Sequence, residues 1–103
     1  MIRVIGIRHI GIETDNMEEM IKFYEKLGLQ VYWDEIEQPD HTGFDEPVRT
    51  VKMFCKDNST IELTTNHKYK NHFALDVKGT ETKTEWIEDP DGNMIEVVNN
   101  DKN

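Results

Sequence analysis

The sequence predicts an α+β fold with one amphipathic helix and several short strands. One segment of the 103-residue chain repeats its apolar side chains at helical spacing, and the other apolar segments are short and rich in β-branched residues. Two turn sequences, Asp57-Asn58-Ser59 and Asp89-Pro90-Asp91-Gly92-Asn93, separate pairs of these short segments, as in β-hairpins. A chain of this length forms one domain, which we assign to residues 1–98, followed by a polar tail at 99–103.

The first half of the chain predicts a strand, a helix and three further strands. Residues 4–13 form the first strand, and Asp15 is placed to cap the helix that follows. One apolar stripe runs along this helix, formed by Met17, Met20, Ile21, Tyr24 and Leu27. Gly28 ends the helix, and strands are expected at 29–36, 48–56 and 60–65, with a loop at 37–47.

The second half predicts strands at 72–78, 84–88 and 94–98 and no second helix. Only six residues stand between Val77 and Thr84, which is too few for a helix and a further strand. The apolar side of these strands, which includes Phe73, Leu75, Val77, Ile95 and Val97, therefore lacks a helix to cover it. We expect a homodimer, because leaving such a face in water is unfavourable.

Charge and composition exclude several classes of partner and indicate a location. The net charge of −9 disfavours binding to nucleic acids or anionic membranes. No apolar run approaches the ~20 residues of a membrane span, and the N-terminal residues lack the apolar region of a signal peptide. Cys55 is the single cysteine, as expected of a structural residue in a reducing cytoplasm.

Two histidines and two glutamates, residue types that can bind metals, lie on the polar sides of predicted strands. They are His9, Glu62, His72 and Glu96. Side chains two residues apart on a strand share a face, whereas those at odd separations point to opposite faces. The aliphatic neighbours of each of these residues stand at odd separations from it, so all four can point to one polar surface. A sheet with one wet face would also place polar residues outward without binding a metal.

Four segments resemble, in order, parts of the vicinal oxygen chelate superfamily, which includes glyoxalase I, bleomycin-resistance proteins and extradiol dioxygenases. They are RHIGIETDNMEEMIKFYEKLGL at 8–29, STIELTTN at 59–66, NHFALDV at 71–77 and EDPDGNMIEVV at 88–98. The chain is most similar to glyoxalase I-like members. This resemblance implies an open barrel of two βαβββ modules, here with a second module that lacks its helix and one strand.

The resemblance also implies roles for individual residues. The family's metal ligands match His9, Glu62, His72 and Glu96, a donor set that suits Zn, Ni, Co, Mn or Fe(II). Glu96 is the expected catalytic base, with Glu62 as its opposed catalytic partner. For the substrate, Asn66 matches a glutathione-contacting position, whereas Glu13 stands where bacterial glyoxalase I has an Arg. Ligands of one metal often come from two chains in this family, which again implies a homodimer.

These expectations favour a metal-dependent lyase or isomerase that acts on a small α-oxo or α-hydroxy compound by metal-stabilised proton transfer. Glu13 would repel the carboxylate of glutathione, so a glutathione adduct is not the expected substrate. Two alternatives stay open. One is a non-catalytic small-molecule-binding protein like the bleomycin-resistance members, and the other is a mononuclear Fe(II) dioxygenase.

Overall fold

The computed structural model describes residues 3–42, 45–65, 71–79 and 83–100. Its elements in chain order are β1 (Arg3–Glu13), α1 (Met17–Lys26), β2 (Gln30–Glu37), α2 (Pro39–Thr42), β3 (Val48–Phe54), β4 (Thr60–Thr64), β5 (His72–Lys78), β6 (Thr84–Glu88) and β7 (Met94–Asn99). The α+β class predicted from the sequence is confirmed. Among the described residues, no helix is both long and apolar enough to cross a membrane.

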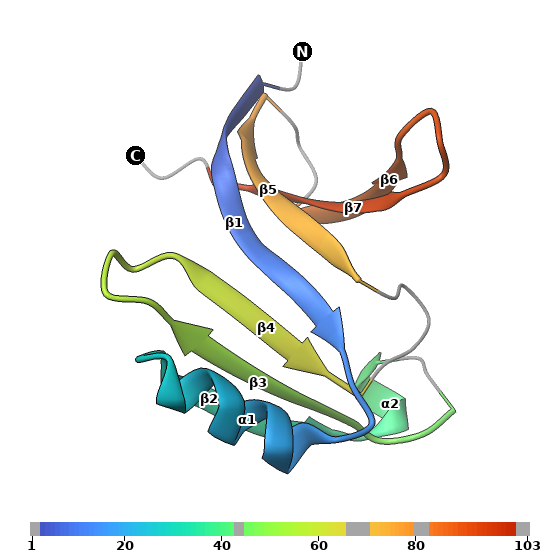
Figure 1. Ribbon diagram of the computed structural model, residues 1–103. Coiled ribbons are helices and arrows are strands. Elements are labelled where there is room, and N and C mark those ends of the chain that lie inside the picture. The colour runs from blue at the N-terminus through green and yellow to red at the C-terminus, as the bar shows by residue number, and fades with distance from the viewer. Residues whose placement is uncertain (1–2, 43–44, 66–70, 80–82, 101–103) are drawn as a thin grey trace.

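The strands form one mixed seven-stranded sheet with the order β2-β3-β4-β1-β5-β7-β6. β1 pairs in parallel with β4, and β5 pairs in parallel with β7. The remaining neighbours, including β1 and β5 at the centre, are antiparallel. Figure 1 shows β1 and β5 side by side, between the layer formed by β2, β3 and β4 and the hairpin of β6 and β7. Each half of the chain therefore contributes one parallel strand pair.

Helix α1 covers one face of the first half of the sheet and makes the core with it (Figure 1). The buried centre consists of Met17, Val51, Met53 and Leu63, and Ile12, Met20, Ile21 and Tyr24 pack around it. This confirms the predicted apolar stripe except at Leu27, which is 65% exposed. Gly28 follows with φ of +103°, a conformation that glycine adopts without steric cost, so the predicted end of the helix is also confirmed.

Several local predictions need correction. Asp15 does not cap α1: the N-cap is Asn16, which makes no side-chain capping hydrogen bond. The backbone N–H of Asn16 instead donates to Thr14 Oγ1 at 2.9 Å, so the turn into the helix starts before Asp15. The predicted loop at 37–47 contains the short helix α2, and β3 ends at Phe54, which leaves Cys55 as a free cysteine in the turn rather than in a strand.

Both predicted turns are present, and in each turn an aspartate side chain accepts hydrogen bonds from residues that follow it. Asp57 accepts hydrogen bonds from the backbone N–H and the hydroxyl of Ser59, at 3.0 and 2.6 Å. Asp89 accepts from the side chain of Asn93 at 2.9 Å and from backbone N–H groups of its own turn. These hydrogen bonds, that from the Asn93 side chain first, hold the pKa of the Asp89 carboxyl below its ordinary value.

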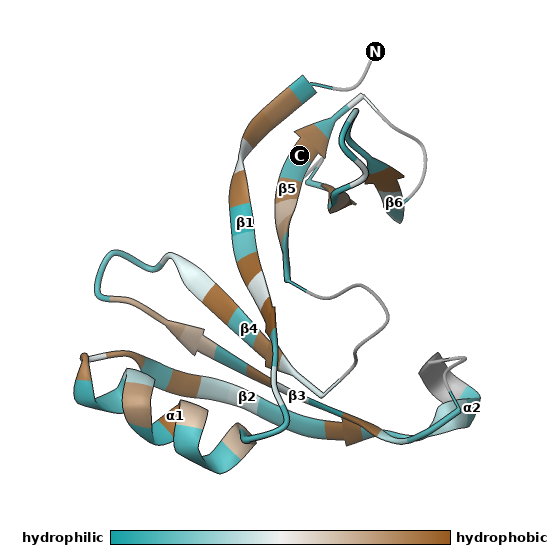
Figure 2. Ribbon diagram, turned by 45° about the vertical axis from the view of Figure 1, so that its right-hand side comes forward, coloured by the Kyte–Doolittle hydropathy of each residue, from teal (hydrophilic) through white to brown (hydrophobic). Residues whose placement is uncertain are grey.

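The second half of the sheet has no helix over it within the described residues (Figure 2). Of the five side chains expected to be uncovered, Val77 and Val97 are nevertheless buried, and Leu75 and Ile95 are half-buried. Phe73 is 47% exposed, and its neighbours on β1, Ile7 and Ile10, are also exposed. The uncovered apolar surface is therefore narrower than predicted and includes β1 as well as β5.

Candidate functional site

The pairing of the central strands brings the predicted ligands to one place. His9 of β1 pairs with Ala74 of β5, which pairs in turn with Glu96 of β7. Two residues further along β1, Gly11 pairs with both Glu62 of β4 and His72 of β5. Because side chains two apart on a strand share a face, these adjacent rows place all four predicted ligands on one face of the sheet.

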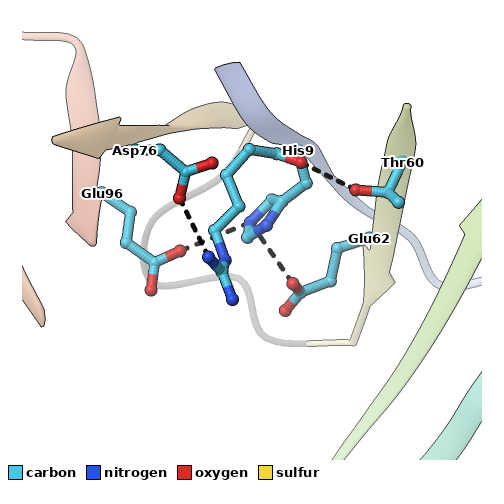
Figure 3. A network of polar contacts seen from close by, with 6 residues as sticks. His9, Thr60, Glu62, Asp76 and Glu96 are labelled. Carbon is cyan, nitrogen blue, oxygen red and sulfur yellow. Dashed lines mark hydrogen bonds and ion pairs between the residues drawn. The ribbon is translucent and has the colours of Figure 1, made fainter. Parts of the chain in front are cut away.

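His9 lies between the two glutamates. Its Nε2 atom is 3.3 Å from Glu62 Oε2 and 3.3 Å from Glu96 Oε1. Figure 3 shows these carboxylates on either side of the imidazole, one from β4 and the other from β7. The ring of His72 approaches His9 edge to face, with centroids 5.8 Å apart, and contacts Trp86 in the same manner at 4.8 Å.

Donor atoms of His9, His72 and Glu96 all lie within 4.8 Å of one another, close enough to bind one ion. Glu62 contacts His9 but falls outside this group of three. His9 Nε2 is buried, and although two carboxylate oxygens stand 3.3 Å away, it makes no hydrogen bond of acceptable geometry with the described residues. Buried polar atoms are normally satisfied, so an unsatisfied imidazole nitrogen beside carboxylates fits a cation-binding site. His9, His72 and Glu96 could therefore hold a divalent metal, and Glu62 stands next to this group through its contact with His9.

The charges around Glu96 favour its ionised form. Burial alone would raise the pKa of this carboxyl, but the contact with His9 and the electrostatic interactions with His9, His72 and Arg8 oppose it. These effects together outweigh burial and hold the pKa of Glu96 below its ordinary value of 4.5. A carboxylate that is charged and partly buried is suited to bind a cation.

Two small residues, Gly11 and Ala74, lie next to the larger side chains of the site. A Cβ atom on Gly11 would lie 2.2 Å from Cε1 of His72, so the imidazole rests directly on the backbone of β1. Ala74 is fully buried and separates His9 from Glu96 in the pairing register. The sequence reasoning missed both residues, although a glycine inside a strand is a known sign of close approach.

A cavity of about 450 Å³ opens beside His9. Its described lining includes Glu62 and Glu96 together with three cationic residues, Arg8, Lys52 and Lys83. Arg8 is held by an ion pair with Asp76 at 2.9 Å. The sequence reasoning did not identify these basic residues, because they stand far apart in the chain and match no motif.

Of the two predicted substrate residues, the structure describes only Glu13, which is not among the described residues that line this cavity. Glu13 lies at the end of β1, and its backbone N–H donates to Asn71 Oδ1 at 3.1 Å. Asn66 lies outside the described residues. The position of Glu13 does not support a role in substrate binding at this cavity, and the role of Asn66 stays a prediction.

No protein-family model matches the chain, and no curated protein matches it either. The resemblance to the vicinal oxygen chelate superfamily therefore stays a prediction from the sequence segments. What the site can do is inferred from its own side chains and their geometry.

Proposed function

We propose that this protein is a metal-dependent lyase or isomerase of the glyoxalase type, acting on a small α-oxo or α-hydroxy compound. The observation that supports the proposal most directly is that the buried His9 Nε2 atom has no hydrogen-bond partner among the described residues. This atom stands 3.3 Å from oxygens of both Glu62 and Glu96.

The strand pairing supports the glyoxalase-like part of the proposal. The order of β1, α1, β2, β3 and β4, with β1 parallel to β4, is compatible with a βαβββ module. In the second half, β5 is parallel to β7, and β6 flanks β7, which is the same arrangement without a helix and one strand. This is the pattern expected of a paired-module open barrel whose second module is shortened.

His9, His72, Glu96 and Glu62 would hold the metal, for which Zn, Ni, Co, Mn and Fe(II) are all suited to the donor set. When bound, such an ion polarises substrate oxygens and stabilises the negative charge that develops on them. The side chains of the site must then move the proton. Glu96 is the proposed base that removes a proton from the carbon next to the carbonyl and becomes protonated, and Glu62, across His9, is its proposed partner, which would return a proton to the product.

The metal-binding part of the proposal is tested by elemental analysis of untagged protein. We expect about one divalent metal per chain, bound tightly enough to survive purification. His72→Ala should lose most of it, because a ligand to the ion is removed, whereas His41→Ala, which changes a histidine of α2, should retain it. Equal metal content in the two variants would show that His72 is not a ligand.

The catalytic part is tested by deuterium exchange from solvent into α-hydroxy ketones. Glu96→Gln keeps the size and an oxygen donor but removes the basic carboxylate, so exchange should fall by ~10²–10⁴-fold while the metal stays bound. Undiminished exchange would move the base to Glu62 or out of the site. A metal-loaded parent protein that catalyses no exchange at all would favour the non-catalytic binding function.

A further inference from the structure

We propose that the cavity beside His9 selects substrates that carry an anionic group, a carboxylate or a phosphate, through Lys52 and Lys83. This inference rests on the proposed function, because it assigns a substrate class to the same site. Its basis is the contrast between the charge of the molecule and the charge of this cavity.

The chain carries 12 Lys and Arg against 21 Asp and Glu. The described lining of the cavity reverses this balance, with three basic residues, Arg8, Lys52 and Lys83, against two acidic ones, Glu62 and Glu96. Both of these glutamates face His9, where they are proposed to bind a cation. The charge left for a ligand is therefore positive, and a cleft concentrates such a field and draws in anions.

The two lysines are more available than the arginine. Arg8 donates to Asp76 at 2.9 Å, so its charge is already compensated. Within the described residues, neither Lys52 nor Lys83 has a carboxylate in ion-pair range. Lys52 instead holds its Nζ atom 4.9 Å from the centre of the Trp33 ring, a cation–π contact that involves no carboxylate.

The lysines flank the candidate metal centre from its two sides. Lys52 is the direct cross-strand neighbour of Glu62, but the carboxylate of Glu62 contacts His9. Lys83 immediately precedes β6, and its carbonyl accepts a hydrogen bond from the backbone N–H of Asn99 at 2.9 Å, which fixes it against the end of β7. A ligand whose oxygens lie beside His9 can thus place a charged end toward either lysine.

The test compares an anion with its neutral counterpart. Lactate and propane-1,2-diol carry oxygens on the same two adjacent carbons, and only lactate is charged. Both are titrated into Zn-loaded protein at constant ionic strength and followed by NMR chemical shifts. The carboxylate of lactate also binds a divalent cation, so tighter binding of lactate than of propane-1,2-diol is not decisive by itself. The decisive result is whether lactate binding depends on the two lysines.

We expect Lys52→Met with Lys83→Met to weaken lactate binding by ~10–100-fold, the usual effect of losing charge-assisted hydrogen bonds. Zn affinity and the binding of propane-1,2-diol should not change. The control is Lys22→Met with Lys26→Met, which removes the same charge from α1. Glycerol 3-phosphate against glycerol, in the same variants, distinguishes a preference for phosphate from one for carboxylate.

If Zn binds and neither anion distinguishes the lysine variant from its control, the inference is overturned and the proposed function stands. If the parent protein does not bind Zn, the proposed metal site is wrong. The lactate and glycerol 3-phosphate titrations are then made on the metal-free protein, where a loss confined to the Lys52 and Lys83 variant still supports the anion site. Equal binding in both variants there overturns it as well.

Discussion

At the scale of single residues, Gly11 decides whether His72 can reach the site. The imidazole of His72 occupies the place where any larger residue on β1 would put its Cβ, which would lie 2.2 Å from Cε1. Contacts this short do not occur, so a side chain at position 11 has to push the ring away. The glycine is therefore part of the site, although it supplies no ligand atom.

We predict that Gly11→Ala lowers metal affinity by ~10–100-fold, the usual effect of disturbing the groups that orient a ligand. The free energy of unfolding should change little in the metal-free protein, because alanine is preferred over glycine in strands by ~0.5–1 kcal/mol and offsets the local clash. Competition with a chelator measures the first effect and urea denaturation the second. Gly6→Ala is the matched control, since a Cβ on Gly6, also in β1, meets nothing within 4 Å. Parent-like metal affinity in Gly11→Ala would show that His72 tolerates displacement.

The sequence predicted some residues of the site and missed others. His9, Glu62, His72 and Glu96 could be predicted to share a face, because strand alternation and apolar neighbours are local properties. Lys52 and Lys83 could not be placed beside them, because that depends on which strands are neighbours in the sheet. Their place in the wall of the cavity depends on the assembled sheet.

At the scale of elements, Arg49 ties α1 to the sheet. Its Nε and Nη2 atoms donate to the two carboxylate oxygens of Asp34 on β2 at 3.0 and 2.8 Å, and Nη1 donates to Glu18 in the first turn of α1. The hydrogen bonds from Arg49 lower the pKa of Asp34 below its ordinary value of 3.8, although partial burial opposes this. A carboxyl whose pKa is lowered by folding stabilises the protein above its unfolded pKa, and this contribution is lost as the pH falls through the lowered value.

We predict that Asp34→Asn lowers the free energy of unfolding by ~0.5–1 kcal/mol near neutral pH, a small effect because the pair is exposed to solvent. The difference from the parent should shrink as the pH falls below about 4, where the carboxyl becomes protonated in the unfolded chain and then in the folded one. Urea denaturation at several pH values measures it. Glu35→Gln is the control, because it makes the same charge change at the next residue of β2. A deficit for Asp34→Asn that is constant at all pH values would contradict the role of the ion pair.

The boundaries of the elements show where local patterns are sufficient. β5 and β6 have the predicted limits, because each is a short apolar run between clear turn signals. The cap of α1 was assigned to Asp15 instead of Asn16, since two suitable residues stand side by side and only the hydrogen bond to Thr14 decides between them. The helix α2 was missed because four residues are too few to show a helical period.

At the scale of the whole molecule, the parallel pairs of β1 with β4 and of β5 with β7 bring the site together. These pairings join segments about 50 and 20 residues apart, and no local pattern in the sequence specifies which strands become neighbours. The spacing of residues alone did not imply these neighbours in the sheet. The residue types of the candidate site could therefore be predicted from the sequence, whereas the strand pairing that brings them together could not.

The pairing also leaves an apolar surface that α1 does not cover. On β1 it includes Val4, Ile7 and Ile10, and on β5 it includes Phe73, which pairs with Ile10. A cavity of about 440 Å³ adjoins this surface and has Ile10, Phe73 and Ile95 in its wall. Contiguous exposed apolar surface of this kind usually marks an interface. We propose that a second copy of the chain covers it, because this apolar surface continues from β1 onto β5, over which the described residues place no helix.

A homodimer of this form should be broken by a charge placed on β1. Ile7 is 67% exposed in the isolated chain, so Ile7→Lys should leave the fold intact while placing an ammonium group in the interface, where an unpaired buried charge is strongly unfavourable. Leu27→Lys is the matched control, since Leu27, at the C-cap of α1, is 65% exposed. In sedimentation equilibrium at micromolar concentration we expect twice the chain mass of 12.1 kDa for the parent protein and Leu27→Lys, and the single mass for Ile7→Lys. A parent protein that stays monomeric with metal bound, or an Ile7→Lys variant that dimerises as the control does, would show that this surface does not bind a second copy.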